Sequence, residues 1–164
     1  MGARRVKGRG AAAARRLAQA TAGLLAALTG CAPLPPAGAV ALPPIPPGEA
    51  RVWVYRIYDP TESLTIPYVY MNGAAIGLAQ QGGAFYRDVP AGRYRVTVES
   101  VGVDLYQFQD IGLAPGQQAY LEIQSLRSWV SGRPGFGRDT FYVAVLPPER
   151  AARLIALGRF YGGS

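Results

Sequence analysis

From Ala50 onward, apolar and polar residues alternate in short runs, and Gly, Pro, Asn and Asp cluster between those runs. This pattern is typical of short strands that bury one face. Residues 93–100 show it most clearly, because Tyr94, Val96 and Val98 fall on one face and polar residues on the other. The same criteria predict strands at residues 51–58, 68–71, 74–77, 85–89, 93–100, 111–113, 118–124 and 141–146.

Asn72 and Gly73 give the strongest turn signal in the chain. Both residue types tolerate the positive φ angles of a type I′ turn, so the strands on either side are expected to form a hairpin. A two-residue loop would pair Met71 with Ala74, Tyr70 with Ala75, Val69 with Ile76 and Tyr68 with Gly77. This register places Tyr68 and Tyr70 on one face of the hairpin and the apolar side chains on the other.

The segment after the last predicted strand has the features of a short helix. Pro148 suits a first turn, Glu149 complements the positive end of the helix dipole, and Gly158 can end the helix. A helix this short must dock on a sheet, and its apolar face is Ala151, Leu154 and Ile155. The predicted fold is therefore all-β, an antiparallel β-sandwich of about seven strands with one short C-terminal helix.

Several motifs resemble a domain-of-unknown-function family found in small bacterial lipoproteins. They are Val52-x-Val54-Tyr55-Arg56, the hairpin at residues 70–73, the run at residues 89–98, and Leu113-Ala114-Pro115-Gly116-Gln117. The family is similar in turn to PEGA and carboxypeptidase-regulatory-like sandwiches, and the resemblance covers residues 50–157. Because its motifs are turn chemistry and core alternation, the resemblance implies a sandwich fold and supplies no catalytic residues or cofactor.

The first 30 residues have the features of a targeting segment. A basic stretch precedes an apolar run at residues 17–28, which is shorter than the roughly 20 residues that span a bilayer. Leu28-Thr29-Gly30-Cys31 resembles the lipobox of bacterial lipoproteins. The resemblance implies signal-peptidase recognition through Leu28, Thr29 and Gly30, cleavage before Cys31, and lipidation of Cys31. A mitochondrial transit peptide and a twin-arginine signal remain as alternatives.

Residues 31–49 contain seven of the 14 prolines and no aromatic residue. This composition predicts a semi-rigid linker after the lipidated Cys31, reaching roughly 50 Å when extended. A partner groove that binds the Pro-rich segment is the alternative. The predicted organisation is a signal peptide at 1–30, a linker at 31–49, a sandwich at 50–158 and a tail at 159–164.

The charge of +7 is distributed unevenly along the chain. Residues 1–30 carry six basic residues and no acid, whereas residues 31–164 carry 11 basic residues and 10 acids. A domain this close to neutral has no electrostatic footprint for nucleic acid. We therefore expect a membrane partner through the lipid anchor, and an envelope protein or glycan as further partner. Ala32 after the cysteine favours the outer membrane, on its periplasmic face or at the cell surface, by resemblance to lipoprotein sorting.

Catalytic and metal chemistry have few candidate residues. The chain has no His and one Cys, which excludes Ser-His and Cys-His nucleophile systems and Cys-rich zinc sites. No metal, cofactor or enzymatic activity is therefore expected. Asp59 and Glu62 are the one carboxylate pair that could do acid–base work, but an Asx turn at Asp59 is favoured.

Two aromatic groups are candidate ligand-binding surfaces. Trp129, Arg133, Phe136 and Arg138 lie in a Gly-rich loop at residues 125–139 and could contact a sugar or an anionic polymer. Packing of Trp129 against the sandwich edge is the favoured alternative. Tyr68 and Tyr70, with Tyr55 as a further member, could form a carbohydrate platform, although such aromatics more often stabilise a hairpin.

Overall fold

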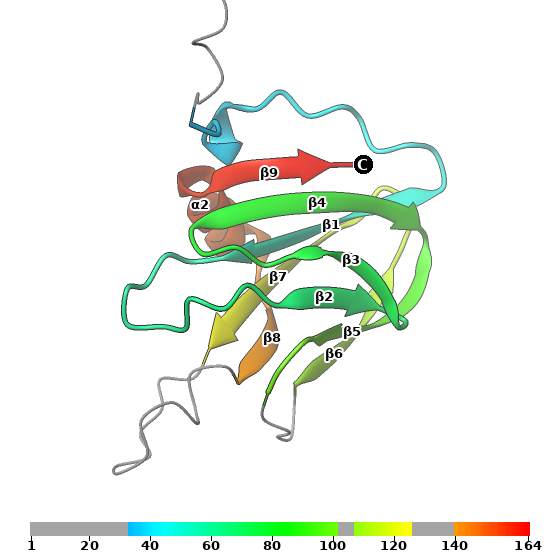
Figure 1. Ribbon diagram of the computed structural model, residues 1–164. Helices are drawn as coiled ribbons and strands as arrows, with labels where there is room; N and C mark the ends of the chain where they lie inside the picture. Colours follow the sequence, from blue (N-terminus) through cyan, green and yellow to red (C-terminus); the bar gives the residue numbers. More distant parts are fainter. Residues whose placement is uncertain (1–32, 102–106, 126–139) are drawn as a thin grey trace, which may run out of the picture. The chain divides into compact units, whose positions relative to one another are not determined.

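The computed structural model describes residues 33–101, 107–125 and 140–164. Within these ranges, nine strands form two sheets that pack face to face, and one α-helix covers the outer face of the larger sheet (Figure 1). The all-β sandwich is therefore confirmed. The elements are a 3-10 turn η1 (Ala37–Ala39), β1 (Glu49–Arg56), β2 (Tyr68–Met71), β3 (Ala74–Leu78), β4 (Gly83–Pro90), β5 (Gly92–Val98), β6 (Phe108–Leu113), β7 (Gln118–Ser125), β8 (Phe141–Val145), α2 (Pro148–Leu157) and β9 (Arg159–Gly163).

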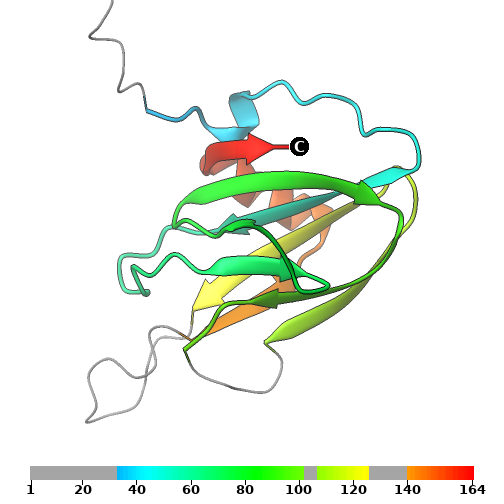
Figure 2. The ribbon, with the colours of Figure 1, turned by 45° about the vertical axis from the view of Figure 1, so that its right-hand side comes forward.

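The larger sheet has the order β8-β7-β1-β4-β9 and the smaller sheet the order β3-β2-β5-β6. Figure 2 shows the two layers from a second direction. Most strand pairs are antiparallel, as predicted, but β1 pairs with β7, and β4 with β9, in parallel. The second parallel pair follows from α2, which carries the chain back across the sheet so that β9 runs in the direction of β8.

The main core fills the space between the two sheets. Strand β1 contributes Ala50, Val52 and Val54 from one side, and β2 and β5 contribute Val69 and Val96 from the other. All five are completely buried. The inward faces predicted for residues 93–100 and 118–124 agree with this core, since Val96, Val98, Leu121 and Ile123 belong to it.

A second apolar cluster lies between the larger sheet and α2. Trp53 and Tyr55 of β1 point to this side and pack with Ala151 and Ile155 of the helix. Strand β1 is therefore buried on both faces, as is usual for a central strand covered by a sheet on one side and a helix on the other. The apolar face predicted for the helix is thus the face that docks.

The β2–β3 hairpin forms at the predicted turn, with positive φ at both Asn72 and Gly73. Met71 pairs with Ala74 and Tyr70 with Ala75, as expected. A bulge then shifts the register by one residue, so that Val69 pairs with Gly77 and Tyr68 with Leu78. Gly77 lies against the Phe85 ring. A Cβ added at Gly77 would stand 2.6 Å from a ring carbon, so a side chain here would require the ring to move.

The segment predicted as a C-terminal tail is instead the edge strand β9, which extends the larger sheet beside β4. Gly83 faces the Tyr161 ring and Gly163 faces the Tyr86 ring, each so closely that a Cβ would stand about 2.0 Å from a ring carbon. Gly83 of β4 and Gly163 of β9 thus allow the two strands to pack closely against these rings. Gly158 ends α2 in an extended conformation, and its N–H donates to Ile155 O, so no left-handed glycine cap is used.

Candidate functional site

The N-terminal arm joins the folded domain at Pro35. Phe160 N donates to Pro35 O at 2.8 Å, Ala37 N donates to Gly158 O at 2.7 Å, and Pro36 forms a bridge with Arg159. Ala37 is buried in the cluster under α2. The chain is therefore fixed to the domain four residues after Cys31, so the segment predicted as a semi-rigid linker at residues 31–49 is docked on the domain from Pro35 to Ala37.

Small residues and proline carbonyls explain this docking. Proline lacks an N–H donor, but its carbonyl still accepts, as Pro35 O does from β9. Gly38 lies against Ala156, where an added Cβ would stand 3.0 Å from the Ala156 Cβ. Further along the arm, Val40 and Leu42 line a hollow of about 240 Å³ over Trp53. Composition did not predict this docking, because the absence of aromatic residues indicated a linker, whereas small residues and backbone carbonyls make the contacts.

A shallow groove lies beside the docked arm, at the end of the sandwich where β1 and α2 finish and β4 and β9 begin. Its volume is about 170 Å³, and backbone atoms of Gly82, Gly83 and Gly158 contribute to its lining. Arg159 N donates to Gly82 O at 2.8 Å, which ties the first residue of β9 to the residue before β4. The side chains that line the groove are Tyr55, Arg56, Ile57, Tyr58, Leu154 and Leu157.

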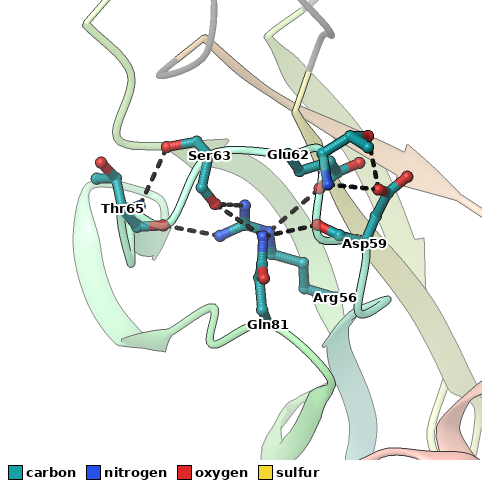
Figure 3. Close-up of polar contacts among 7 residues, drawn as sticks. Arg56, Asp59, Glu62, Ser63, Thr65 and Gln81 are labelled. Atoms are coloured by element: carbon teal, nitrogen blue, oxygen red, sulfur yellow. Dashed lines mark hydrogen bonds and ion pairs between the residues drawn. The ribbon is translucent and has the colours of Figure 1, made fainter.

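The β1–β2 loop, residues 57–67, projects from the same end and is organised by Arg56 (Figure 3). The Arg56 side chain is fully buried, and its two terminal nitrogens donate to Thr65 O at 2.7 Å and to Ser63 O at 2.5 Å. Its Nε lies 3.6 Å from a carboxylate oxygen of Glu62, and the guanidinium lies 4.9 Å from the centre of the Phe141 ring. A buried cation thus holds the loop against the core.

Other polar groups of the loop also form hydrogen bonds. Gln81 Nε2 donates to Ser63 O at 2.8 Å and to Asp59 O at 3.3 Å. Asp59 Oδ1 accepts from Thr61 N at 2.8 Å and from the Thr61 hydroxyl at 2.6 Å, which confirms the predicted Asx turn. Asp59 and Glu62 each therefore have a structural role in the loop, one in its turn and the other beside Arg56.

Apolar side chains project from this end of the sandwich. Leu64 is 82% exposed, Tyr58 67% and Leu157 84%. Ten of the twelve exposed large apolar side chains in the described ranges belong to strand ends, loops or the arm at this end, and Leu42 and Val145 are the other two. We call this surface the apolar end; it comprises Leu34, Ile57, Tyr58, Leu64, Ile66, Tyr68, Leu78, Val101, Phe108 and Leu157.

The predicted tyrosine face is present only in part. The Tyr68 and Tyr70 rings lie 6.3 Å apart and are tilted by 42°. Tyr55 is not part of it, because it points under α2, where its hydroxyl donates to Glu122 Oε2 at 3.4 Å. Burial and the nearby Glu122 carboxylate raise the pKa of Tyr55 well above its usual value. The alternation of residue types along β1 could not predict which face packs against the helix, because both faces of this strand are buried.

A larger hollow, of about 440 Å³, lies over β5 and β6. Arg95 and Asp110 cross it with two hydrogen bonds of 2.7 Å, and both side chains are more than half exposed. The hydrogen bond from Arg95 lowers the pKa of the Asp110 carboxyl. The charges of Arg95 and Asp110 thus neutralise each other, and Arg93 is the other charged residue that lines the hollow.

Several predicted site residues lie outside the described ranges. These are the lipidation residue Cys31, the recognition residues Leu28, Thr29 and Gly30, and the loop residues Trp129, Arg133, Phe136 and Arg138. The strand ends that flank that loop, Ser125 and Phe141, are at the apolar end.

Within the described ranges, no group of three or more His, Cys, Asp or Glu side chains could hold a metal ion. The helices in these ranges include none that is long and apolar enough to cross a membrane. Comparison of the chain with protein-family models and with curated proteins found no match in either.

Proposed function

We propose that this protein is a lipid-anchored lipoprotein of the bacterial cell envelope, in which a non-enzymatic β-sandwich acts as a binding or accessory module. The observation that carries the proposal is the order of features before the domain: a basic stretch, an apolar run, and then Leu28, two small residues and Cys31. A thiol is the group that accepts a diacylglyceryl chain through a thioether, and small neighbours give a peptidase access to the backbone. Ala32 after the cysteine favours the periplasmic face of the outer membrane or the cell surface as the location, by resemblance to lipoprotein sorting.

The docked arm supports the proposal. If Cys31 becomes the first residue of the mature chain, only three residues separate it from Pro35, which is hydrogen-bonded to β9. The mature protein then begins with an anchor and continues almost at once into the fold. Two or three acyl chains on one residue meet the requirement for stable anchoring, at about 0.8 kcal/mol for each buried CH₂ group.

The charge distribution also supports this assignment. Removal of residues 1–30 takes six of the seven net positive charges with it. The remaining domain has 11 basic and 10 acidic residues, and three of its cations are paired with carboxylates within the described part. Nucleic acid is therefore not proposed as a partner.

Cys31→Ala tests the anchor directly. In cells that carry out lipoprotein maturation, we expect the wild-type protein in the detergent phase after phase separation and the variant in the aqueous phase. Ala32→Ser is the matched control, because it changes the neighbouring small residue and leaves the thiol, and it should partition as wild type. Equal partitioning of Cys31→Ala and wild type would contradict the lipoprotein assignment.

Glycan or peptidoglycan binding is the second candidate function. The observation that favours it is the pair formed by the exposed Tyr68 and the half-buried Tyr70, since aromatic rings that reach solvent can stack on sugars. Binding of the purified domain to peptidoglycan sacculi should then fall in Tyr68→Ala, or in Trp129→Ala if the loop at residues 125–139 is the contact. Retention that is unchanged in both variants would remove this candidate.

A further inference from the structure

Most of the exposed large apolar side chains in the described ranges are gathered at one end of the domain, and the N-terminal arm enters the fold at the same end. Leu157 immediately precedes Gly158, whose carbonyl accepts from Ala37 of the arm. Arg159 forms a β-bridge with Pro36, and its N–H donates to Gly82 O. Gly82 in turn lies against Tyr58: a Cβ added at Gly82 would stand 3.2 Å from the Tyr58 Cβ. A series of direct contacts thus leads from the arm to the most exposed aromatic residue of the apolar end.

We propose that the apolar end lies against the bilayer that holds the acyl chains of Cys31, so that the lipid headgroup region is the surface it binds. This inference rests on the proposed lipidation of Cys31. It adds a defined orientation, in which the strands stand away from the membrane and the β2–β3 and β6–β7 turns point outward.

The length of chain between the anchor and the fold limits which surface can meet the bilayer. Three residues lie between Cys31 and Pro35, which makes four steps from one Cα to the next, and a fully extended chain spans at most about 3.6 Å per residue, so the two Cα atoms are at most about 14 Å apart. A domain of this size is about 35 Å across. A free linker from 32 to 49 would instead have allowed roughly 50 Å and any orientation. With Pro35 docked, the end that carries Pro35 is held near the membrane.

The chemistry of this end suits a lipid–water interface. Tyrosine rings prefer the level of the headgroups, where the ring is buried and the hydroxyl stays hydrated, and Tyr58 and Tyr68 are both exposed here. Leu64 and Leu157 are the most exposed leucines in the described ranges. Arg159, exposed between Leu157 and the arm, supplies a cation that lipid phosphates attract.

Weak individual contacts are sufficient for this arrangement. The acyl chains already keep the domain at the membrane, so contact by the apolar end is an intramolecular step with a high effective concentration. The carboxylates of the loop do not oppose it strongly, because Glu62 lies beside Arg56 and Asp59 accepts two hydrogen bonds within its turn. Exposed apolar side chains that gather at one end of a domain mark an interaction surface, and the bilayer is the surface within reach of this end.

Site-specific fluorescence tests the orientation. Cys31 is the one cysteine of the chain, and its thiol is consumed by the lipid, so an introduced cysteine in the purified full mature lipoprotein is the unique labelling site. Leu157→Cys and Leu64→Cys place an environment-sensitive dye at the apolar end. Ala114→Cys places it at the opposite end of the strands, in the exposed β6–β7 turn, and is the matched control.

In vesicles of phosphatidylethanolamine and phosphatidylglycerol, we expect blue-shifted emission and quenching by nitroxide-labelled lipid at positions 157 and 64, and neither effect at 114. Insertion of a flexible Gly-Ser segment after Ala32 should reduce quenching at 157 towards the value at 114, since a longer linker releases the orientation. All three labelled positions are exposed, so the substitutions leave the core intact.

Two outcomes would overturn the proposal and a third would instead reject its premise. Equal quenching at 157, 64 and 114 in a lipidated sample excludes the orientation. Disulfide-linked dimers of Leu157→Cys without lipid quenching would show that a second copy of the chain covers the apolar end. Dye incorporated at Cys31 itself, with no acyl mass on the N-terminal peptide, would show that the proposed lipidation fails rather than the orientation.

Discussion

Replacing Arg56 with methionine removes the buried guanidinium that holds the β1–β2 loop while keeping an unbranched apolar side chain in its place. The guanidinium donates to Thr65 O at 2.7 Å and to Ser63 O at 2.5 Å, and Arg56 is only 1% exposed. Each hydrogen bond from a charged donor contributes about 1.5–3 kcal/mol, so their loss costs about 3–6 kcal/mol before compensation.

Two effects reduce this cost. Methionine does not need to be desolvated as a buried cation does, and Ser63 O keeps its hydrogen bond from Gln81. We therefore expect the free energy of unfolding to fall by about 3 kcal/mol. With a urea m-value of about 2 kcal/mol per molar, the denaturation midpoint of the purified mature protein should fall by about 1.5 M.

Arg95→Met is the matched control. Arg95 also makes two hydrogen bonds of 2.7 Å, to Asp110, but both side chains are more than half exposed, and an exposed ion pair contributes little. Its midpoint should move much less than that of Arg56→Met. Equal shifts in the two variants would refute the argument that burial of Arg56 is what fixes the loop.

Two further predictions concern other parts of the fold. Gly83→Ala should destabilise the protein by about 1–3 kcal/mol, because its Cβ would stand 2.0 Å from the Tyr161 ring, whereas Gly112→Ala, with nothing within 4 Å, should have little effect on the same urea curve. The free energy of unfolding should decline as the pH rises above 10, the ordinary pKa of tyrosine, because Tyr55 loses its proton at a lower pH in the unfolded chain than in the folded chain. Tyr55→Phe should flatten that decline in denaturation midpoints measured from pH 9 to 11; an unchanged slope would contradict the raised pKa.

Local sequence signals predicted much of the sandwich. Asn72-Gly73 predicted the hairpin because Asn and Gly adopt the positive φ angles of a type I′ turn more readily than other residues, and the structure has positive φ at both. The alternation at residues 93–100 identified the inward face for the same kind of reason, since period two is a property of the strand itself. Ala151 and Ile155 were found because a 3.6-residue period marks a docked face.

The elements that were missed depend on tertiary contacts. Strand β9 has the sequence Arg-Phe-Tyr-Gly-Gly, which looks like a tail, and it becomes a strand because α2 delivers it beside β4 in parallel. The docking of Pro35 and Ala37 needs that same strand and helix as a template. Two parallel pairs, a docked arm and the position of Tyr55 under α2 all have this long-range origin.

The apolar end was likewise beyond sequence reasoning. Leu64, Ile66 and Leu157 have the residue types of a core, and nothing in their local pattern distinguishes an exposed position from a buried one. Their common location emerges only when the strand order brings the loops to one end. Cys31 is the opposite case, because its signal is a local motif and needs no fold to be recognised.

The chemical state of Cys31 tests the central claim most directly. Mass spectrometry of the N-terminal peptide of the protein purified from membranes would identify it. The lipoprotein assignment predicts that the mature chain begins at Cys31 and carries a thioether-linked diacylglyceryl group. A chain that retains residues 1–30, or one that begins elsewhere with Cys31 as an unmodified thiol, would contradict it.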